Sequence, residues 1–346
     1  MAVQRIIIEE AEADQRLDRW LKKRFSMVGQ AQVEKWCRKG ELRIDGGRCK
    51  ASTRIAAGQE VRIPPLPPAQ GEQPLKVPAR ISDADTAMIR GAVIFKDDHL
   101  LVLNKPPGLP SQGGTNQKRH VDGLSEALKF GYPDKPRLVH RLDKDTSGVL
   151  LLARTAQMAR RLSDAFRHRA TRKIYWAAVA GVPLPKMGSI KYGLVKSGGH
   201  GTKGEGEKME ALHPRDIKSV DGAKRAHSDY AVISNLAQRA SWVALTPITG
   251  RTHQLRVHMA AIGHPIIGDG KYGGSGQENL GDGWGAQLGG MISRKLHLHA
   301  RFIRFEHPVT GKAVSYTASL PPHMVQSWSA FQWHEQEAEE DPFIAT

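Results

Sequence analysis

The densest group of chemically active side chains lies in residues 140–148, which read His-Arg-Leu-Asp-Lys-Asp-Thr-Ser-Gly and precede the apolar run VLLLA. A loop ahead of a buried strand can hold such groups rigidly at a surface. Of its two carboxylates, Asp143 is the stronger candidate, because Leu142 anchors the chain before it and the basic residues on either side favour its ionised form. The competing interpretation is a solvated Asp-Thr-Ser-Gly turn with a surface salt bridge.

Two carboxylates in one loop also raise the possibility of a glycoside hydrolase that uses Asp143 and Asp145. These residues are separated by one position within a Lys-Asp-Thr-Ser turn, and only 6% of the chain is Phe, Trp or Tyr, the residues that bind sugars by stacking. Both features argue against a hydrolase.

A second group lies in residues 250–259, which read GRTHQLRVHM. A helix that starts near Arg251 would point Leu255 and Arg256 at one pocket. The Arg256 guanidinium could then hold a carboxylate through two hydrogen bonds, and the helix N-terminus would offer free amides to a phosphate. The alternative is an ordinary amphipathic helix with exposed Arg and His.

Metal and nucleotide sites are poorly supported by the sequence. His253 and His258 are five positions apart, so they do not share a helical face as an i, i+4 pair would, and neither an HExxH motif nor a Cys pair accompanies them. Residues 199–208, GHGTKGEGEK, lack the GxxxxGK[ST] spacing of a phosphate loop, and the chain has no GxSxG motif. We therefore expect no metal and no cofactor.

Composition indicates a cytoplasmic protein without a membrane segment. The 346 residues are 40% hydrophobic and 25% charged, and they contain no apolar run of the roughly 20 residues that a membrane helix needs. The N-terminus is acidic where a targeting peptide would be basic. Cys37 and Cys49 are the only cysteines, which is typical of a reduced compartment.

The charge of the chain favours a polyanionic partner. The formal net charge is +16, and residues 16–54 contribute +8 of it through 12 basic and 4 acidic side chains. Residues 137–173 contribute +7 through 10 basic and 3 acidic side chains. One such cluster is ordinarily a solvated face, but two clusters on differently built segments favour RNA or DNA.

The positions of these elements predict two domains. Residues 14–62 read as a compact unit of two helices and a hairpin, in which Gly40 ends the second helix and an apolar stripe includes Leu17 and Trp20. The basic residues of this unit lie towards its other side and are the candidate RNA-binding residues: Arg16, Arg19, Lys23, Arg24, Lys35, Arg38 and Lys39. Residues 63–91 are Pro-rich and predict an extended linker.

Residues 92–326 predict one larger domain. Short strands outnumber helices and mostly do not alternate with them, which is typical of an α+β fold with a largely antiparallel sheet. We expect helices at 155–170, capped by Thr155, and at about 251–262, with long loops at 186–227 and 273–293. Residues 327–346 are expected to form an acidic, disordered tail, with the alternative that its acidic run folds back on a basic surface.

Three motifs taken together resemble those of the ribosomal large subunit pseudouridine synthases. They are His140-Arg141-Leu142-Asp143 with Thr146-Ser147-Gly148, then Lys173-Ile174-Tyr175, then GRTHQLRVH. The unit from RLDRWL through RKGELRIDG resembles the S4 RNA-binding module that precedes many of these enzymes. With the segment LLVLNKPPGLPSQGG, the resemblance covers about residues 14–320.

The resemblance implies the isomerisation of uridines in RNA, most specifically in 23S ribosomal RNA, by an enzyme without a cofactor. Asp143 would be the catalytic aspartate, and the base would be flipped out of the RNA. Tyr175 would stack on the uracil, Arg256 would pair with the aspartate, and Leu255 would contact the base. Arg141 would fill the gap left by the flipped uridine, and its motif neighbour His140 and Arg251 of the third motif would help to bind the substrate.

The resemblance also implies an RNA partner, and we expect the protein to act as a cytoplasmic monomer. The remaining alternative is a ribosome-assembly or RNA-binding protein in which the synthase fold has lost activity. The presence of Asp143, Tyr175 and Arg256 argues against that alternative.

Overall fold

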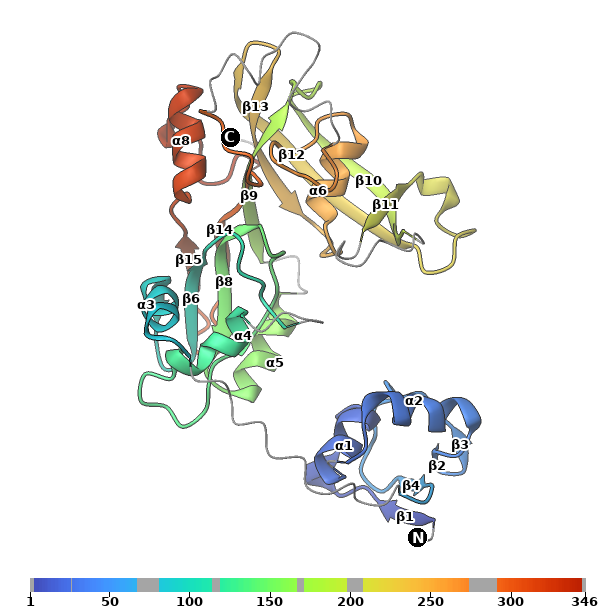
Figure 1. Cartoon of the computed structure of the whole chain (residues 1–346). Coiled ribbons are helices and arrows are strands. Elements are labelled where there is room, and N and C mark those ends of the chain that lie inside the picture. The colour runs from blue at the N-terminus through green and yellow to red at the C-terminus, as the bar shows by residue number, and fades with distance from the viewer. Residues whose placement is uncertain are drawn as a thin grey trace. The chain divides into compact units, whose positions relative to one another are not determined.

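The computed structural model describes residues 3–25, 27–66, 81–113, 119–166, 171–197, 208–273 and 291–343. The chain divides into two compact units, Met1–Arg80 and Ile81–Thr346 (Figure 1). The division lies inside the stretch that the sequence predicted to be a linker. Each unit is described separately.

The first unit pairs two helices with a small antiparallel sheet. The helices are α1 (Leu17–Arg24) and α2 (Gln30–Lys39), with a short 3-10 turn, η1, at Glu10–Glu12. The sheet has the order β1-β4-β2-β3, formed by Gln4–Ile7, Glu60–Ile63, Arg43–Ile44 and Gly47–Arg48. Strand β1 lies outside the predicted bounds of 14–62, because its exposed and half-buried alternation is too short to stand out from the acidic residues that follow it.

The apolar stripe predicted for the first unit forms its core. Leu17, Trp20 and Leu21 of α1 pack with Val33 and Trp36 of α2. Helix α2 ends at Gly40, which adopts the left-handed conformation (φ 71°) that a residue with a Cβ rarely adopts. Burial of this stripe leaves the basic residues on the opposite side of both helices.

The second unit is built on one large, mostly antiparallel sheet, which confirms the predicted α+β fold. The strand order is β11-β10-β12-β13-β9-β14-β8-β6-β5, with β15 beside β14 and β7 beside β8. The strands are β5 Val93–Lys96, β6 Leu100–Lys105, β7 Arg137–Leu138, β8 Ser147–Ala153, β9 Arg172–Ala180, β10 Met187–Lys196, β11 Met209–Leu212, β12 Lys224–Leu236, β13 Ala240–Pro247, β14 Leu298–Glu306 and β15 Ala313–Thr317. Only the β8–β14 pair is parallel among the described strand pairs.

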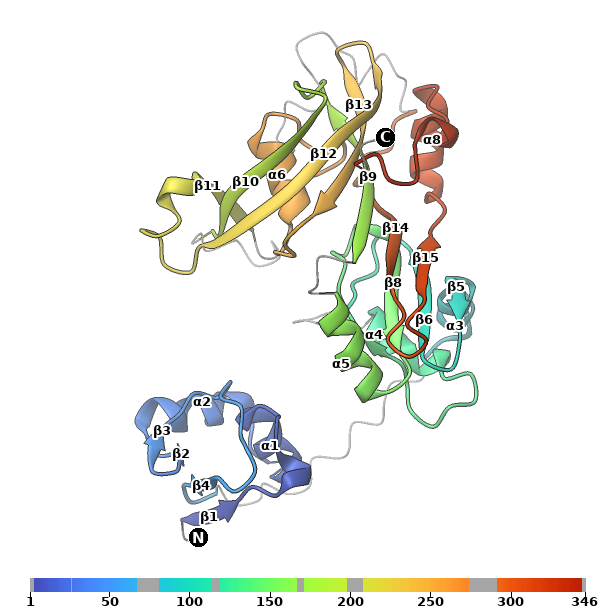
Figure 2. The ribbon, with the colours of Figure 1, turned by 180° about the vertical axis from the view of Figure 1, so that it is seen from behind.

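Helices and turns cover this sheet at several places (Figure 2). The α-helices are α3 Asp83–Gly91, α4 Val121–Leu124, α5 Ala156–Ala165, α6 Gln254–Ala261 and α8 Pro322–Ala330, and the 3-10 turns are η2 Ser125–Leu128, η3 Pro214–Asp216 and η5 Glu335–Glu337. Thr155 caps α5 as predicted, since its hydroxyl accepts a hydrogen bond from the Met158 amide at 3.1 Å. None of the helices in the described residues is long and apolar enough to cross a membrane.

Two central strands connect the halves of the sheet. Strands β9 and β14 pair with each other. On its other side β9 pairs with β13, and on its other side β14 pairs with β8 (Figures 1 and 2). The loop before β8 and the loop after β13 therefore start from the middle of one continuous sheet. These loops contain the two groups of chemically active side chains found in the sequence.

The structure corrects three sequence predictions about the chain's organisation. Residues 83–91 form α3, capped by Ser82 and anchored by the buried Ile89, so they belong to the second unit rather than to the linker. Much of 186–227 forms strands β10, β11 and the start of β12. These strands contain few buried apolar residues among exposed Ser, Lys and Arg, so the segment has the polar composition of a loop. The other predicted loop, 273–293, lies mostly outside the described residues.

The predicted disordered tail is the third correction. Within 327–343, Trp328, Phe331 and Trp333 are buried against the Trp242 region of the sheet. Arg172 on β9 also forms two hydrogen bonds to Asp341, at 2.6 and 2.7 Å. The tail is acidic overall, but its aromatic residues bury enough apolar surface to pack it on the sheet.

Candidate active site

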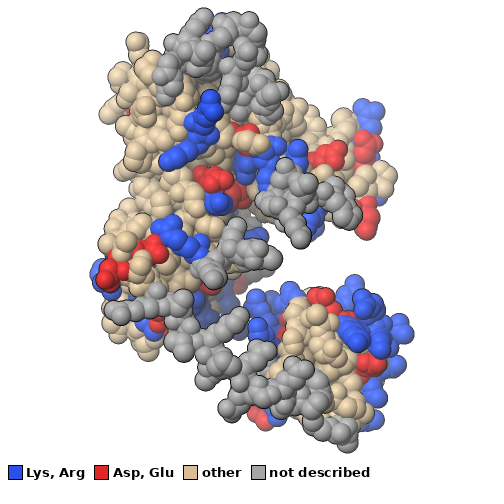
Figure 3. Space-filling view, viewed as in Figure 1, with Lys and Arg blue, Asp and Glu red and all other residues tan. Residues whose placement is uncertain are grey.

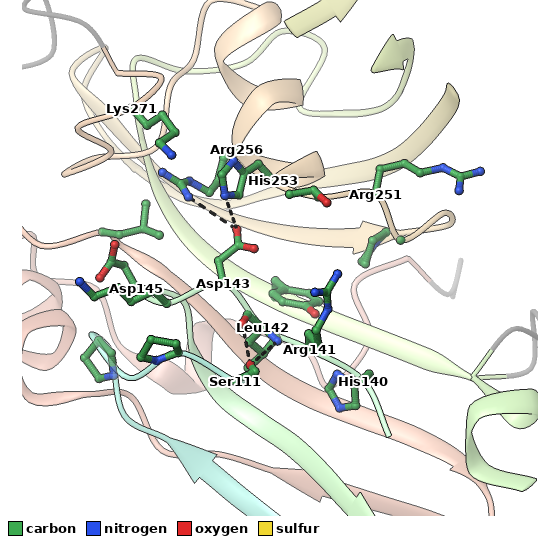
Figure 4. Close-up of a pocket in the computed structure, with 18 of the residues that line it drawn as sticks. Ser111, His140, Arg141, Leu142, Asp143, Asp145, Arg251, His253, Arg256 and Lys271 are labelled. Atoms are coloured by element: carbon green, nitrogen blue, oxygen red, sulfur yellow. Dashed lines mark hydrogen bonds and ion pairs between the residues drawn. The ribbon is translucent and has the colours of Figure 1, made fainter. Parts of the chain in front are cut away.

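A cavity of about 1910 Å³ lies in the second unit between the two loops. Its walls come from four parts of the chain, residues 107–113, 140–145, 247–256 and 268–271, with further contributions from β9 and from residues 294–296. Figure 4 shows how these segments converge on Asp143. The three predicted catalytic residues, Asp143, Tyr175 and Arg256, all line this one cavity.

Two basic side chains approach the Asp143 carboxylate. Its Oδ2 lies 3.6 Å from Nη1 of Arg256 and 3.9 Å from Nε2 of His253 (Figure 4). Arg256 is 7% exposed, so this charge acts where water screens it little.

Arg256 is itself held by a second carboxylate. Its Nε and Nη2 donate to the two oxygens of Asp269, both at 2.7 Å. Burial lowers the pKa of a guanidinium, but these hydrogen bonds and the charge of Asp269 leave the pKa of Arg256 above its usual value. Arg256 therefore remains a cation, with its fork occupied by Asp269 and its remaining nitrogen directed at Asp143.

The backbone on both sides of Asp143 is clamped. The Ser111 hydroxyl accepts from the Leu142 amide at 3.0 Å and donates to the Leu142 carbonyl at 2.7 Å. The fully buried Lys105 ammonium donates to the carbonyl of Lys144 at 3.0 Å and also to those of Pro106 and Leu109. Burial lowers the pKa of Lys105 to about 7.

We expect Ser111→Ala to lower the single-turnover rate by roughly tenfold, because it leaves the buried amide and carbonyl of Leu142 without their partner, at a cost of about 1–3 kcal/mol. The rate and the RNA affinity are measured separately, and the affinity should stay unchanged. Ser241→Ala is the matched control, since it also removes a buried hydroxyl bonded to a carbonyl, that of Gly181, at 2.7 Å. Equal rate losses in both variants would contradict a role for Ser111 at the site.

Tyr175 reaches the cavity from β9. It packs against the apolar clusters on both sides of the sheet's centre, which fix the ring. Burial and the nearby Asp143 charge raise the pKa of its phenol, so Tyr175 is neutral and presents an aromatic face with a hydroxyl. Such a side chain can stack on a base.

Of the residues predicted to bind the substrate other than His140, two lie at the cavity and one lies in the core. Arg141 and Arg251 are exposed at the cavity, and the Nε of Arg251 donates to the Arg225 carbonyl at 3.2 Å. Leu255 belongs to a buried apolar cluster and is not among the described lining residues. Successive residues of a helix point about 100° apart, so Leu255 faces the core while its neighbour Arg256 faces the cavity.

His140 lines the cavity, but its ring is engaged in the fold. Its Nε2 accepts from the Leu151 amide at 3.1 Å, and the ring stacks on Phe166 with centroids 4.7 Å apart. Burial, and after it the charge of Lys173, lower the pKa of His140 to about 3. His140 is therefore a neutral acceptor that fixes its loop against β8.

All seven basic residues selected in the first unit are exposed. Three of them form ion pairs: Arg16 with Asp18, Arg24 with Glu12, and Lys39 with Glu41. The other four, Arg19, Lys23, Lys35 and Arg38, form no ion pair with the described residues. Lys and Arg cover much of the visible face of this unit (Figure 3).

Sequence reasoning missed several residues that build the site. Asp269 and Tyr272 were overlooked because they follow α6 in a Gly-rich segment that reads as a loop. His253 was considered only as a metal ligand. Within the described residues, no group of three or more His, Cys, Asp or Glu side chains is placed to hold a metal ion.

Comparisons with known proteins identify the family of the chain. A family model described as RNA pseudouridylate synthase matches residues 99–261. Ribosomal large subunit pseudouridine synthase C of Vibrio vulnificus is 35% identical over 320 residues, which cover 92% of this chain and 93% of that protein. The protein of the same name from Escherichia coli is 33% identical over 321 residues, with 92% and 93% covered.

A solved structure supports the same assignment. Human RNA pseudouridylate synthase domain containing 4 superposes with a TM-score of 0.57 and 30% identity, covering 71% of this chain and 95% of that chain. Together the matches make the chain an RNA pseudouridine synthase, an isomerase. It belongs to the family of the ribosomal large subunit pseudouridine synthases, as the three motifs predicted.

Proposed function

We propose that this enzyme converts specific uridines of large-subunit ribosomal RNA to pseudouridine, with Asp143 as the catalytic residue. The reaction breaks the N1–C1′ bond of uridine, turns the uracil and joins C5 to C1′. A carboxylate can either attack C1′ or remove a ribose proton, and neither role requires a cofactor. The observation that carries the proposal is the Asp143 carboxylate in a cavity with Arg256 and Tyr175.

We propose that the target uridine is flipped out of the RNA to reach this cavity. A glycosidic bond cannot be turned over inside a stacked helix, so binding must offset about a few kcal/mol of unstacking. We propose that Tyr175 stacks on the extruded uracil and that the exposed Arg141 fills the gap in the RNA. Arg251 and other cations at the cavity rim would hold the flanking phosphates.

The proposal is tested by incubating the protein with large-subunit rRNA and mapping pseudouridine by carbodiimide labelling and sequencing. We expect labelled stops at one or a few positions that are absent without the enzyme. RNA binding without any such stop would instead support the catalytically inactive alternative. The names of the relatives support ribosomal RNA as the substrate. The residues that line the cavity come from one chain, which supports a monomer as the acting form. The two free cysteines are consistent with a cytoplasmic enzyme.

We further propose that the first unit is an S4-like module that binds RNA through its basic face. Replacing Arg19, Lys23, Lys35 and Arg38 by Gln should weaken rRNA binding and reduce the slope of log affinity against log salt by up to about 3. The single-turnover rate at saturating RNA should be unchanged, because the cavity lies in the second unit.

The matched control is Arg24→Gln with Lys39→Gln, since these two charges are already paired within the unit. We expect a smaller change in salt slope per substitution than in the fourfold variant. An unchanged slope in the fourfold variant would contradict RNA binding through this face.

A further inference from the structure

Both basic side chains that approach Asp143 reach the same oxygen. Nη1 of Arg256 and Nε2 of His253 lie 3.6 and 3.9 Å from Oδ2 (Figure 4). In the described part of the chain, Oδ1 has neither a hydrogen bond nor an ion pair. The carboxylate is therefore held at one oxygen and open to the cavity at the other.

The effect of His253 on Oδ2 depends on the position of one proton. A neutral imidazole has its proton on either Nδ1 or Nε2, and only the Nε2–H form presents a donor to Asp143. The other form would direct a lone pair at the carboxylate and repel it. His253 can assume this orientation because it has a left-handed backbone (φ 54°) immediately before α6, which turns its side chain back towards the cavity.

The hydrogen bonds of Tyr272 select the tautomer. The Tyr272 hydroxyl oxygen accepts from the Met209 amide at 3.0 Å and lies 2.7 Å from Nδ1 of His253. Nδ1 is the only acceptor that the described residues offer to the hydroxyl hydrogen. The hydroxyl therefore donates to Nδ1, and the imidazole proton is left on Nε2.

The surroundings of His253 keep the ring neutral. Burial lowers its pKa, and the charges of Arg256 and Lys271 lower it further, whereas Asp143 and Asp269 oppose this shift without reversing it. A neutral ring with its proton on Nε2 turns the positive end of its N–H dipole towards Oδ2 across 3.9 Å, which is longer than a hydrogen bond, and it places no full positive charge beside the carboxylate.

We propose that Tyr272 holds His253 as the Nε2–H tautomer and that this pair, together with Arg256, orients Asp143 so that Oδ1 faces the nucleotide. His253 and Tyr272 are then positioning residues, which act on the reaction through Asp143. The inference rests on the proposed function of Asp143 for its catalytic consequence, but the tautomer itself is a property of the free protein.

The tautomer is measured directly by long-range ¹H–¹⁵N NMR of the full chain with ¹⁵N-labelled histidine, with the His253 signal assigned from its loss in His253→Gln. We expect a protonated Nε2 and an unprotonated Nδ1 in the wild type. His264 provides an internal reference of the opposite kind, because its Nδ1 lies 2.9 Å from the Ala180 carbonyl and must be protonated. Tyr272→Phe should mix the two His253 tautomers.

Single-turnover rates at saturating rRNA test the consequence. His253→Gln places an amide nitrogen near the position of Nε2 and should retain most of the rate, whereas His253→Asn places it near Nδ1 and should lose roughly ten- to hundredfold. Tyr272→Phe should lower the rate by about the same factor as His253→Asn. RNA affinity should not change in any of them, and the control His264→Gln should have the wild-type rate.

An Nδ1–H tautomer or an imidazolium in the wild type at neutral pH would overturn the inference, as would a Tyr272→Phe variant with unchanged tautomer and rate. A protein that shows the expected tautomer but forms no pseudouridine in any rRNA would overturn the proposed function and leave the tautomer assignment standing. The NMR spectrum and the rate therefore test the tautomer assignment and the proposed function separately.

Discussion

Asp143→Asn should lower the single-turnover rate of pseudouridine formation by roughly 10⁴-fold or more, the scale on which enzymes lose activity when the group that reacts with the substrate is removed. An amide can neither attack C1′ nor accept a ribose proton as a carboxylate does. RNA affinity should remain within about tenfold, because one carboxylate contributes little beside many phosphate contacts. The rate is measured at saturating rRNA and the affinity by titration.

The structure indicates that Asp143→Asn removes the carboxylate with little effect on the stability of the fold. Asn has nearly the shape of Asp, and the buried Arg256–Asp269 pair stays intact, so the free energy of unfolding should change by less than about 1 kcal/mol. Asp145→Asn is the matched control: it removes an exposed carboxylate two positions away and should keep the wild-type rate. If Asp145→Asn is the more damaging change, Asp143 is not the catalytic residue.

Arg256→Gln should affect both stability and chemistry. It leaves the fully buried Asp269 carboxylate without its guanidinium, which we expect to lower the free energy of unfolding by about 3–5 kcal/mol. It also removes the cation beside Asp143, and the rate at saturating RNA should fall by roughly 10²–10³-fold, the range seen when one preorganised donor is removed. Urea unfolding and single-turnover kinetics measure the two effects.

A second ion pair in the same unit separates these effects. Arg172 binds Asp341 with the same two-point geometry, but its partners are 28% and 12% exposed, compared with 8% and 0% for Arg256 and Asp269. Arg172→Gln should therefore lower stability less and leave the rate unchanged. The double variant Arg256→Met with Asp269→Leu should recover part of the stability, because no charge is left buried although the amides of Lys271 and Tyr272 lose their acceptor, and it should not recover the rate. Recovery of the rate would show that Arg256 acts only through the fold.

The fold class and much of the site could be predicted from local patterns. The stripe of Leu17 and Trp20, the Thr155 cap and the left-handed Gly40 depend on residues within a few positions of one another, and each is found as predicted. Asp143 and Arg256 could be selected from the residue types in their own motifs, whereas Tyr175 could be selected only through the resemblance to the family. They converge on one cavity because the loop before β8, strand β9 and the segment after β13 meet at the centre of the sheet.

Predictions from composition were less accurate. The Pro-rich stretch before residue 83 concealed helix α3, and the acidic end of the chain concealed the buried Trp328 and Trp333. In both places the prediction relied on the average composition of a long segment, whereas a few apolar side chains within the segment decide how it packs. A few buried aromatic residues can hold a segment whose overall composition is polar.

The order of amino acids sets which side chains are available for chemistry and where they occur along the chain. Folding sets which of them meet: it joins Ser111 to Leu142 and Lys105 to Lys144, and it brings Asp269 to Arg256. It also directs Leu255 into the core and Arg256 at the cavity, because successive residues of a helix point about 100° apart and only the packing of α6 decides which of them faces the core. Contacts between distant segments depend on the register of the whole sheet, and no local spacing encodes that register.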